Sequence, residues 1–146
     1  MKEKTKFVAF STQKAERAKP PSRCWQPLTC NYVKGFNVAV IDCDYPQHSI
    51  VEMRERDLKL ALEDEHYKRL AYEQFTRLQK KAYPVVESNT KEALADADYL
   101  LPQGDFDYVF FDLPGTINNE DLIHSLAGMD YLSPRSVPTG LSWKAP

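Results

Sequence analysis

The sequence YVFFDLPG, residues 108–115, decides the fold class. Its first four residues are all apolar, which is typical of a strand that is buried on both faces of a parallel sheet. Asp112 follows the apolar run directly, and the Pro114–Gly115 pair then predicts a turn. The stretch therefore predicts an inner strand with an acid at its carboxyl end.

Two similar apolar runs lie earlier in the chain, KFVAFS at residues 6–11 and FNVAVI at residues 36–41. Residues 49–81 instead show a helical pattern, with a break near residues 63–66. Further elements are predicted as a strand at 83–87, a helix from Asn89 to Leu100 with Asn89 and Glu92 as its cap, a helix at 119–129 and a strand at 130–132. Strands that alternate with helices predict an α/β fold, a parallel sheet with helices on both faces.

The composition is that of one soluble domain. The chain has 146 residues, 42% of them hydrophobic, and a net charge of −2. A net charge of this sign and size does not indicate that the protein binds nucleic acid through its overall charge. It does not decide whether the surface has a local basic patch. No apolar run approaches the roughly 20 residues that span a bilayer, and the charged start at residues 1–6 predicts a cytoplasmic address without a membrane partner. Three cysteines without zinc-type spacing predict neither a disulfide framework nor a structural metal.

Polar residues follow three of the predicted strands. They are Gln13 and Lys14, Asp42 and Asp44, and Asp112. In open parallel sheets the ligand lies outside the carboxyl ends of the strands, and an acid there can hold Mg²⁺ beside a nucleotide phosphate. Strand-ending aspartates are also common without function, and Asp42 and Asp44 could belong to a solvated turn. Both interpretations stay open at this point.

Three motifs together resemble one known family. STQK at residues 11–14, VAVIDCDYPQHS at 38–49 and DYVFFDLPG at 107–115 look like the ParA/MinD-type partition ATPases. The likeness is greatest to the ParA-like (TraA) proteins of Bacteroides conjugative transposons. It covers residues 7–14 and 32–131, and it implies a P-loop NTPase fold.

The resemblance also implies a site. Lys14 matches the signature lysine that reaches the partner subunit's nucleotide, and Gln13 lies beside it. Asp44 matches the acid that orients the hydrolytic water, Asp42 the neighbouring acid near magnesium, and Asp112 the Walker B aspartate. The family implies ATP and Mg²⁺ as cofactors and an ATP-bridged homodimer. It also implies non-specific DNA binding and a partner protein in partition, maintenance or conjugative transfer of a mobile element.

The chain departs from the family where its phosphate loop is expected. The family has G-G-x-G-K-T-T directly after Gln-Lys, whose glycines let backbone N–H groups surround the phosphates. Residues 15–31 are instead AERAKPPSRCWQPLTCN, in which no glycine occurs and three prolines oppose a helix. Lys19 coincides with the loop lysine, but it lacks the cradle. A working P-loop is therefore not expected.

A shifted reading frame would explain this departure, and the alternative is a genuine, divergent proline-rich loop and tail, which predicts an intact gene in which base insertions give no better reading. GGCGGAGCGGGCAAAACCACC encodes G-G-A-G-K-T-T, and without its first base it encodes A-E-R-A-K-P-P, the sequence of residues 15–21. The tail RSVPTGLSWKAP, residues 135–146, behaves similarly. A DNA sequence that encodes it also encodes I-S-A-D-R-V-V-L-E-S-T when it is read from its third base. We therefore expect one partial, truncated domain over residues 1–146, with aberrant segments at 15–31 and 133–146 and impaired ATPase activity.

Two alternatives have other functions. A receiver-type signalling domain also gathers acids at strand ends, so Asp42, Asp44 and Asp112 would suit it. A non-catalytic remnant could instead pair with an intact homologue through residues 49–81. The three histidines are interpreted as surface or capping residues, and Cys43, between two acids, as a thiol of raised pKa without a nucleophilic role.

Overall fold

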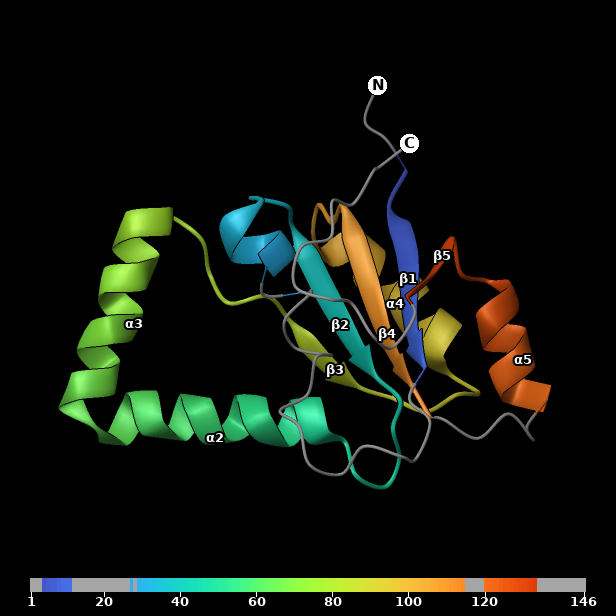
Figure 1. Ribbon diagram of the computed structural model, residues 1–146, viewed down its shortest axis with the longest axis horizontal. Helices are drawn as coiled ribbons and strands as arrows, with labels where there is room; N and C mark the ends of the chain where they lie inside the picture. Colours follow the sequence, from blue (N-terminus) through green and yellow to red (C-terminus); the bar gives the residue numbers. More distant parts are fainter. Residues whose placement is uncertain (1–3, 12–26, 28, 115–119, 134–146) are drawn as a thin grey trace.

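The computed structural model describes residues 4–11, 27, 29–114 and 120–133 (Figure 1). Five parallel strands form one sheet in the order β3-β2-β4-β1-β5. The strands are β1 (Lys6–Ser11), β2 (Val38–Asp42), β3 (Val85–Glu87), β4 (Tyr108–Leu113) and β5 (Tyr131–Ser133). The helices are η1 (Thr29–Val33), α2 (Ser49–Glu63), α3 (Glu65–Leu78), α4 (Ala93–Leu100), η2 (Leu101–Gln103) and α5 (Glu120–Ala127).

The alternation of apolar residues along the inner strands makes two cores, one on each face of the sheet. On one face Val38, Val40 and Phe110 pack with Ile50 of α2, and the η1 side chains of Cys30 and Tyr32 lie against them. The other face packs against α4 and α5 through Ala39, Ile41, Val109, Phe111, Ala93, Ala97 and Leu122. The prediction of an α/β fold with a parallel sheet is confirmed.

The order of the strands creates a topological switch point at β1 and β4. After β1, the described part of the connection lies on the face of α2. After β4 the chain passes through α5 on the opposite face and returns beside β1 as β5. Neighbouring strands whose connections leave toward opposite faces open a crevice at their carboxyl ends, where α/β proteins bind ligands.

Most predicted elements lie within two residues of the observed ones. The strand predicted at 36–41 is observed as β2 (Val38–Asp42), because Asn37 is held outside the ladder by its bonds to Asp105 and Asp107. The predicted break in the long helix is Asp64, which has extended backbone and accepts a hydrogen bond from the backbone N–H of His66. Asn89 accepts two backbone hydrogen bonds as predicted, and the regular helix α4 then begins at Ala93.

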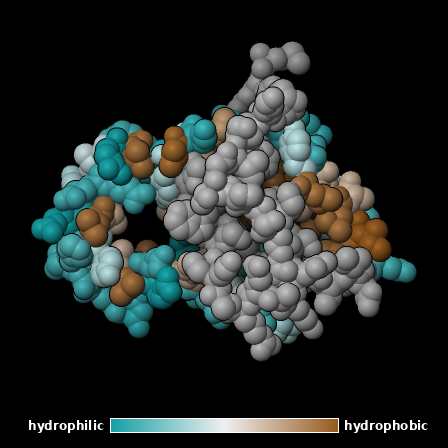
Figure 2. All heavy atoms as spheres, in the orientation of Figure 1, coloured by the Kyte–Doolittle hydropathy of each residue, from teal (hydrophilic) through white to brown (hydrophobic). Residues whose placement is uncertain are grey.

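The helices α2 and α3 form an arm that projects from the sheet (Figure 1). Ile50, in the first turn of α2, is the one residue of that helix that is buried, and α3 buries none. Figure 2 shows an opening between this arm and the rest of the molecule. We call residues 58–78 the outer arm. In the part of the chain that the structure describes, no helix has the length and apolar content that crossing a membrane requires.

Candidate functional site

The acids predicted from the sequence meet at the switch point. Asp112 is the register partner of Phe10 in β1 and of Asp42 in β2. Neither acid has any exposed surface. By the alternation along the strands, both side chains lie on the sheet face that α2 covers. The sheet therefore places two buried carboxylates side by side, next to the end of the first strand.

Asp42 is bound to the beginning of α2. Its Oδ2 accepts hydrogen bonds from the backbone N–H groups of Ile50 at 3.0 Å and Val51 at 3.1 Å. Its Oδ1 accepts one from the N–H of Asp44 at 3.3 Å. His48, the N-cap residue by position, makes no such side-chain bond. Asp42 therefore supplies the cap from a neighbouring strand, and the positive end of the helix dipole stabilises its charge.

Asp44 does not share the strand face of Asp42, because β2 ends at Asp42. It lies half-buried in a turn, where its carbonyl oxygen accepts hydrogen bonds from the N–H groups of Gln47 and His48, both at 2.9 Å. The turn at residues 45–47 ends the extended backbone, so the two carboxylates do not lie on one strand face. Asp44 consequently lies just beyond the carboxyl end of β2, where its N–H donates to Oδ1 of Asp42.

His48 is a member of this cluster that the sequence did not indicate. Its backbone has a left-handed conformation with φ of 39°, and its ring is buried. Nδ1 lies 3.2 Å from the carbonyl oxygen of Asp42 and 3.7 Å from its Oδ1, and Nε2 lies 3.6 Å from Oε1 of Glu87. The imidazole thus connects the ends of β2 and β3. The only hint in the sequence was its place one residue before the predicted helix.

Cys43 points into the opposite core. It is 1% exposed and packs with Ala39 and Ile41. Burial, and then the charges of Asp42 and Asp112, raise the pKa of the Cys43 thiol to about 12. The expected raised pKa is confirmed, and burial rather than the neighbouring acids is its main cause.

A cavity of about 250 Å³ lies at the opposite end of the sheet from these acids. Its lining includes Asn37 and Pro84, directly before β2 and β3, and Phe106, two residues before β4. Asn31 and Tyr83 also line it. Its position at the amino ends separates it from the switch point. It is consequently not the crevice that the strand order defines.

The two residues predicted to bind the nucleotide, Gln13 and Lys14, lie outside the described residues, as do most of the segments 15–31 and 133–146. The structure does describe Ser11, at the end of β1, as the register partner of Leu113. The chain therefore leaves β1 toward Gln13 and Lys14 from the same edge of the sheet that holds Asp112. Of the predicted site, Asp42 and Asp112 are brought together and Asp44 is brought near.

The described residues agree in part with a magnesium site. Among them, no three His, Cys, Asp or Glu side chains gather as metal ligands. Mg²⁺ beside a nucleotide needs only one or two carboxylates, since water and phosphate oxygens fill the other positions. Asp112 suits that role, whereas Oδ2 of Asp42 is already engaged by two N–H groups.

The strand order also bears on the receiver-type alternative. Receiver domains share the flavodoxin-like order 2-1-3-4-5, in which the first strand lies between the second and the third. Here β1 lies between β4 and β5. The strand order of the described sheet therefore differs from the flavodoxin-like order.

Comparison of the chain with protein-family models, with curated proteins and with solved structures gave no match. The functional interpretation consequently depends on the three sequence motifs and on the geometry of the switch point.

Proposed function

We propose that the chain descends from a ParA-like P-loop ATPase that acts in partition, maintenance or conjugative transfer of a mobile element. The carboxyl ends of β1, β2 and β4 are then the edge where this lineage holds Mg²⁺ and ATP. One observation carries the proposal: Asp42 and Asp112 are fully buried register partners next to the end of the first strand.

Asp112 supports the proposal because packing alone disfavours an acid at its position. It lies between Phe111 and Leu113 in an inner strand and has no exposed surface. Burying a carboxylate costs several kcal/mol before compensation. A buried carboxylate in an otherwise apolar core is the kind of exception that is expected at a functional site.

The roles of the two buried acids differ in this proposal. Asp42 fixes the beginning of α2 on the sheet, and with it the turn that carries Asp44. Asp112 would hold magnesium through its carboxylate or through a bound water. Magnesium, when it accompanies ATP, neutralises the charge of the phosphates. Lys14 and Gln13 would follow β1 at the same edge.

The chain as it stands is proposed to be impaired. Residues 15–21 offer no glycine for the backbone to wrap a phosphate, so Lys14 and Asp112 lack the loop between them. The proposed function is thus that of the lineage, and neither tight ATP binding nor hydrolysis is expected of this sequence.

The test compares this chain with a repaired one. In the repaired chain residues 15–30 are replaced by GGAGKTTVTVLAASYL, the product of the restored frame, and circular dichroism checks that both chains fold. Mg-ATP should raise the melting temperature of the repaired chain and leave that of the original unchanged. Asp112→Asn in the repaired chain should remove the shift. A repaired, folded chain that ignores Mg-ATP would contradict the lineage, and a shift in the original chain would contradict the impairment.

A further inference from the structure

The cavity at the amino ends of the strands lies between two segments that are far apart in the sequence. Asn31 of η1 lines one part of it, and residues 79–84, between α3 and β3, line another. Figure 1 shows both segments near the beginning of β2. The cavity volume of about 250 Å³ is that of about eight water molecules. Because the cavity lies at the opposite end of the sheet from Asp42 and Asp112, its chemistry is independent of the proposed function.

Asn31 brings an unused hydrogen-bond donor to this cavity. The residue is 4% exposed, and its Nδ2 has no acceptor in the part of the chain that the structure describes. Burial raises the pKa of the neighbouring Tyr32 phenol, and Arg54 and then Asn31 oppose that rise. Buried donors without an acceptor are rare, so this one indicates a bound molecule. The amide turns about its χ2 angle, so its N–H groups can meet an acceptor that enters the cavity.

Two lysines give the cavity a positive charge. Lys80 and Lys81 line it together with one acid, Asp105. The Lys80 ammonium donates to the carbonyl oxygen of Phe36 at 2.7 Å and to Oδ1 of Asn37 at 3.2 Å, so one of its three N–H groups remains for a further acceptor. Both of these acceptors are neutral, and neither lysine forms an ion pair within the described residues. An anion in the cavity would therefore meet positive charge that no carboxylate neutralises by direct contact.

The polar wall of the cavity is already fixed by hydrogen bonds. The N–H of Asn37 donates to Oδ2 of Asp107 at 2.7 Å, and its Nδ2 donates to the carbonyl oxygen of Asp105 at 3.1 Å. The carbonyl oxygen of Asn37 accepts from the N–H groups of Asp107 at 2.7 Å and Tyr108 at 3.3 Å. With Lys80 on its Oδ1, every polar group of Asn37 is engaged. A site that is fixed before binding loses little freedom when the ligand enters.

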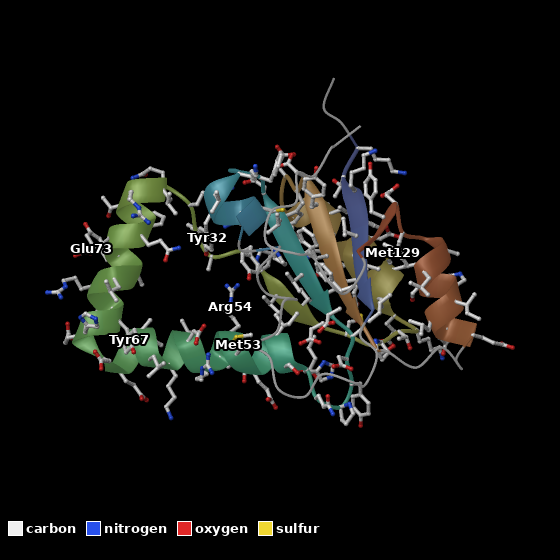
Figure 3. All side chains as sticks on the ribbon, in the orientation of Figure 1. Tyr32, Met53, Arg54, Tyr67, Glu73 and Met129 are labelled. Atoms are coloured by element: carbon white, nitrogen blue, oxygen red, sulfur yellow. The ribbon has the colours of Figure 1, made fainter. Side chains whose placement is uncertain are left out.

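The apolar side of the cavity is also held in place. Tyr83 is 6% exposed and lines the cavity with Pro84 and Phe106. The Arg54 guanidinium lies 4.4 Å from the centre of the Tyr83 ring and donates to the Tyr83 carbonyl oxygen at 2.9 Å. Figure 3 shows Arg54 pointing from α2 toward Tyr32 of η1, whose ring centre lies 6.2 Å from that of Tyr83. The cavity therefore offers a fixed apolar surface beside its cations.

We propose that this cavity binds a small carboxylate with an apolar body. The carboxylate accepts hydrogen bonds from Nδ2 of Asn31 and from the remaining N–H of Lys80, and the exposed Lys81 adds charge at the rim. Such charge-assisted hydrogen bonds are about twice as strong as neutral ones. The apolar body packs against Tyr83 and Phe106. A singly charged ligand matches the described lining, whose two lysines and one aspartate leave one net positive charge.

Sodium benzoate, a carboxylate of this size, and benzamide, its neutral counterpart, are the probes that test the proposal. Each is titrated into the full chain at constant ionic strength, and two-dimensional proton–nitrogen NMR follows the Asn31 side-chain amide and the backbone N–H groups of the lining. We expect a dissociation constant of about 1–10 mM for benzoate, since a ligand with so few atoms binds weakly. Benzamide should bind at least about fivefold more weakly. Equal affinities would overturn the proposal, as would signals that do not move up to about 50 mM benzoate, which would leave the cavity to water.

Two variants and a matched control locate the binding. Asn31→Leu keeps the size of the side chain and removes the unused donor, so the free energy of unfolding should stay the same or increase. The dissociation constant for benzoate should nevertheless rise about fivefold or more. Lys81→Met should raise it about threefold or more, and Lys59→Met, at an exposed position of α2 outside the lining, by less than about 1.5-fold. Equal effects of the two lysine variants would overturn the proposal, and this pair decides it even if Asn31→Leu loses its fold.

Discussion

Asp42 and Asp112 are register partners on adjacent parallel strands, and both carboxylates are fully buried. The sequence places them 70 residues apart, and the return of the chain through α4 sets β4 beside β2. The two acids have different surroundings, because Asp42 accepts the N–H groups of α2 whereas Asp112 lies toward the end of β1. They should therefore respond differently to substitution.

Removing the carboxylate of Asp42 should destabilise the fold. Asp42→Ala leaves the N–H groups of Ile50 and Val51 without their acceptor at the beginning of α2. We expect a loss of about 2–4 kcal/mol in the free energy of unfolding, the sum of a lost cap and of buried groups without partners. Urea denaturation measures it. Asp57→Ala, an exposed acid on the same helix, is the control and should cost less than about 0.5 kcal/mol. Similar losses in both variants would show that Asp42 is not the cap of α2.

Asp112 should behave as a residue kept for function. Asp112→Asn has nearly the same shape and removes a buried charge, so the free energy of unfolding of this chain should change by less than about 1 kcal/mol or increase. In the repaired chain the same substitution should abolish the stabilisation by Mg-ATP. Thermal unfolding with and without Mg-ATP measures both effects. A loss of stability as large as that of Asp42→Ala, with the Mg-ATP response intact, would assign Asp112 a structural role.

The sequence predicted the sheet well because the inner strands β2 and β4 are buried on both faces. Runs such as YVFFDL contain no polar residue before the acid, so their burial and their ends are both visible. The break in the long helix was also predictable, since Asp64 caps the helix that follows it. These features depend on neighbours within a few residues.

The features that the sequence did not show depend on distant contacts. The cap of α2 comes from Asp42, eight residues before Ile50 and on a strand, so no capping pattern indicates it. The ring of His48 lies between Asp42 and Glu87 of β3, whose Oε1 is 3.6 Å from Nε2. Glu87 is distant in the sequence, so this placement could not be predicted. The projection of α3 likewise follows from the direction of α2, and its pattern of charges and apolar residues predicts only an amphipathic helix.

Cys43 should make stability depend on pH in the alkaline range. Its pKa is about 12 in the folded chain, against 9.0 for an ordinary thiol. The folded state therefore keeps its proton where the unfolded state loses it. The contribution of Cys43 to stability is fully present below pH 9 and is lost as pH rises toward 12. Urea denaturation across this range should show a fall that Cys43→Ala reduces. The same slope in Cys43→Ala would contradict this assignment.

The thiol of Cys43 should also resist alkylation in the native chain. The nucleophile is the thiolate, and both burial and the raised pKa suppress it here. Iodoacetamide at pH 8, followed by mass spectrometry, should label Cys30, which is only half-buried, before Cys43. Denaturant should make the two rates similar. Rapid native labelling of Cys43 would show that the core around Ala39 and Ile41 opens.

The reading frame of the source DNA after the Gln13–Lys14 codons tests the frameshift hypothesis directly. Resequencing the source DNA should show G-G-A-G-K-T-T directly after the Gln13–Lys14 codons, either in frame, if extra bases are present there and near Leu132, or in the frame shifted by one base. Extra bases would restore G-G-A-G-K-T-T and a longer, competent ATPase, in which Lys14, Asp44 and Asp112 take their family roles. Under the proposed function, an unchanged sequence would mean either a decayed gene or a genuine divergent loop, and ATP binding would then not be expected of the product. An unchanged sequence whose product nevertheless binds Mg-ATP would contradict the frameshift, because the loop at residues 15–21 would then be a functional one.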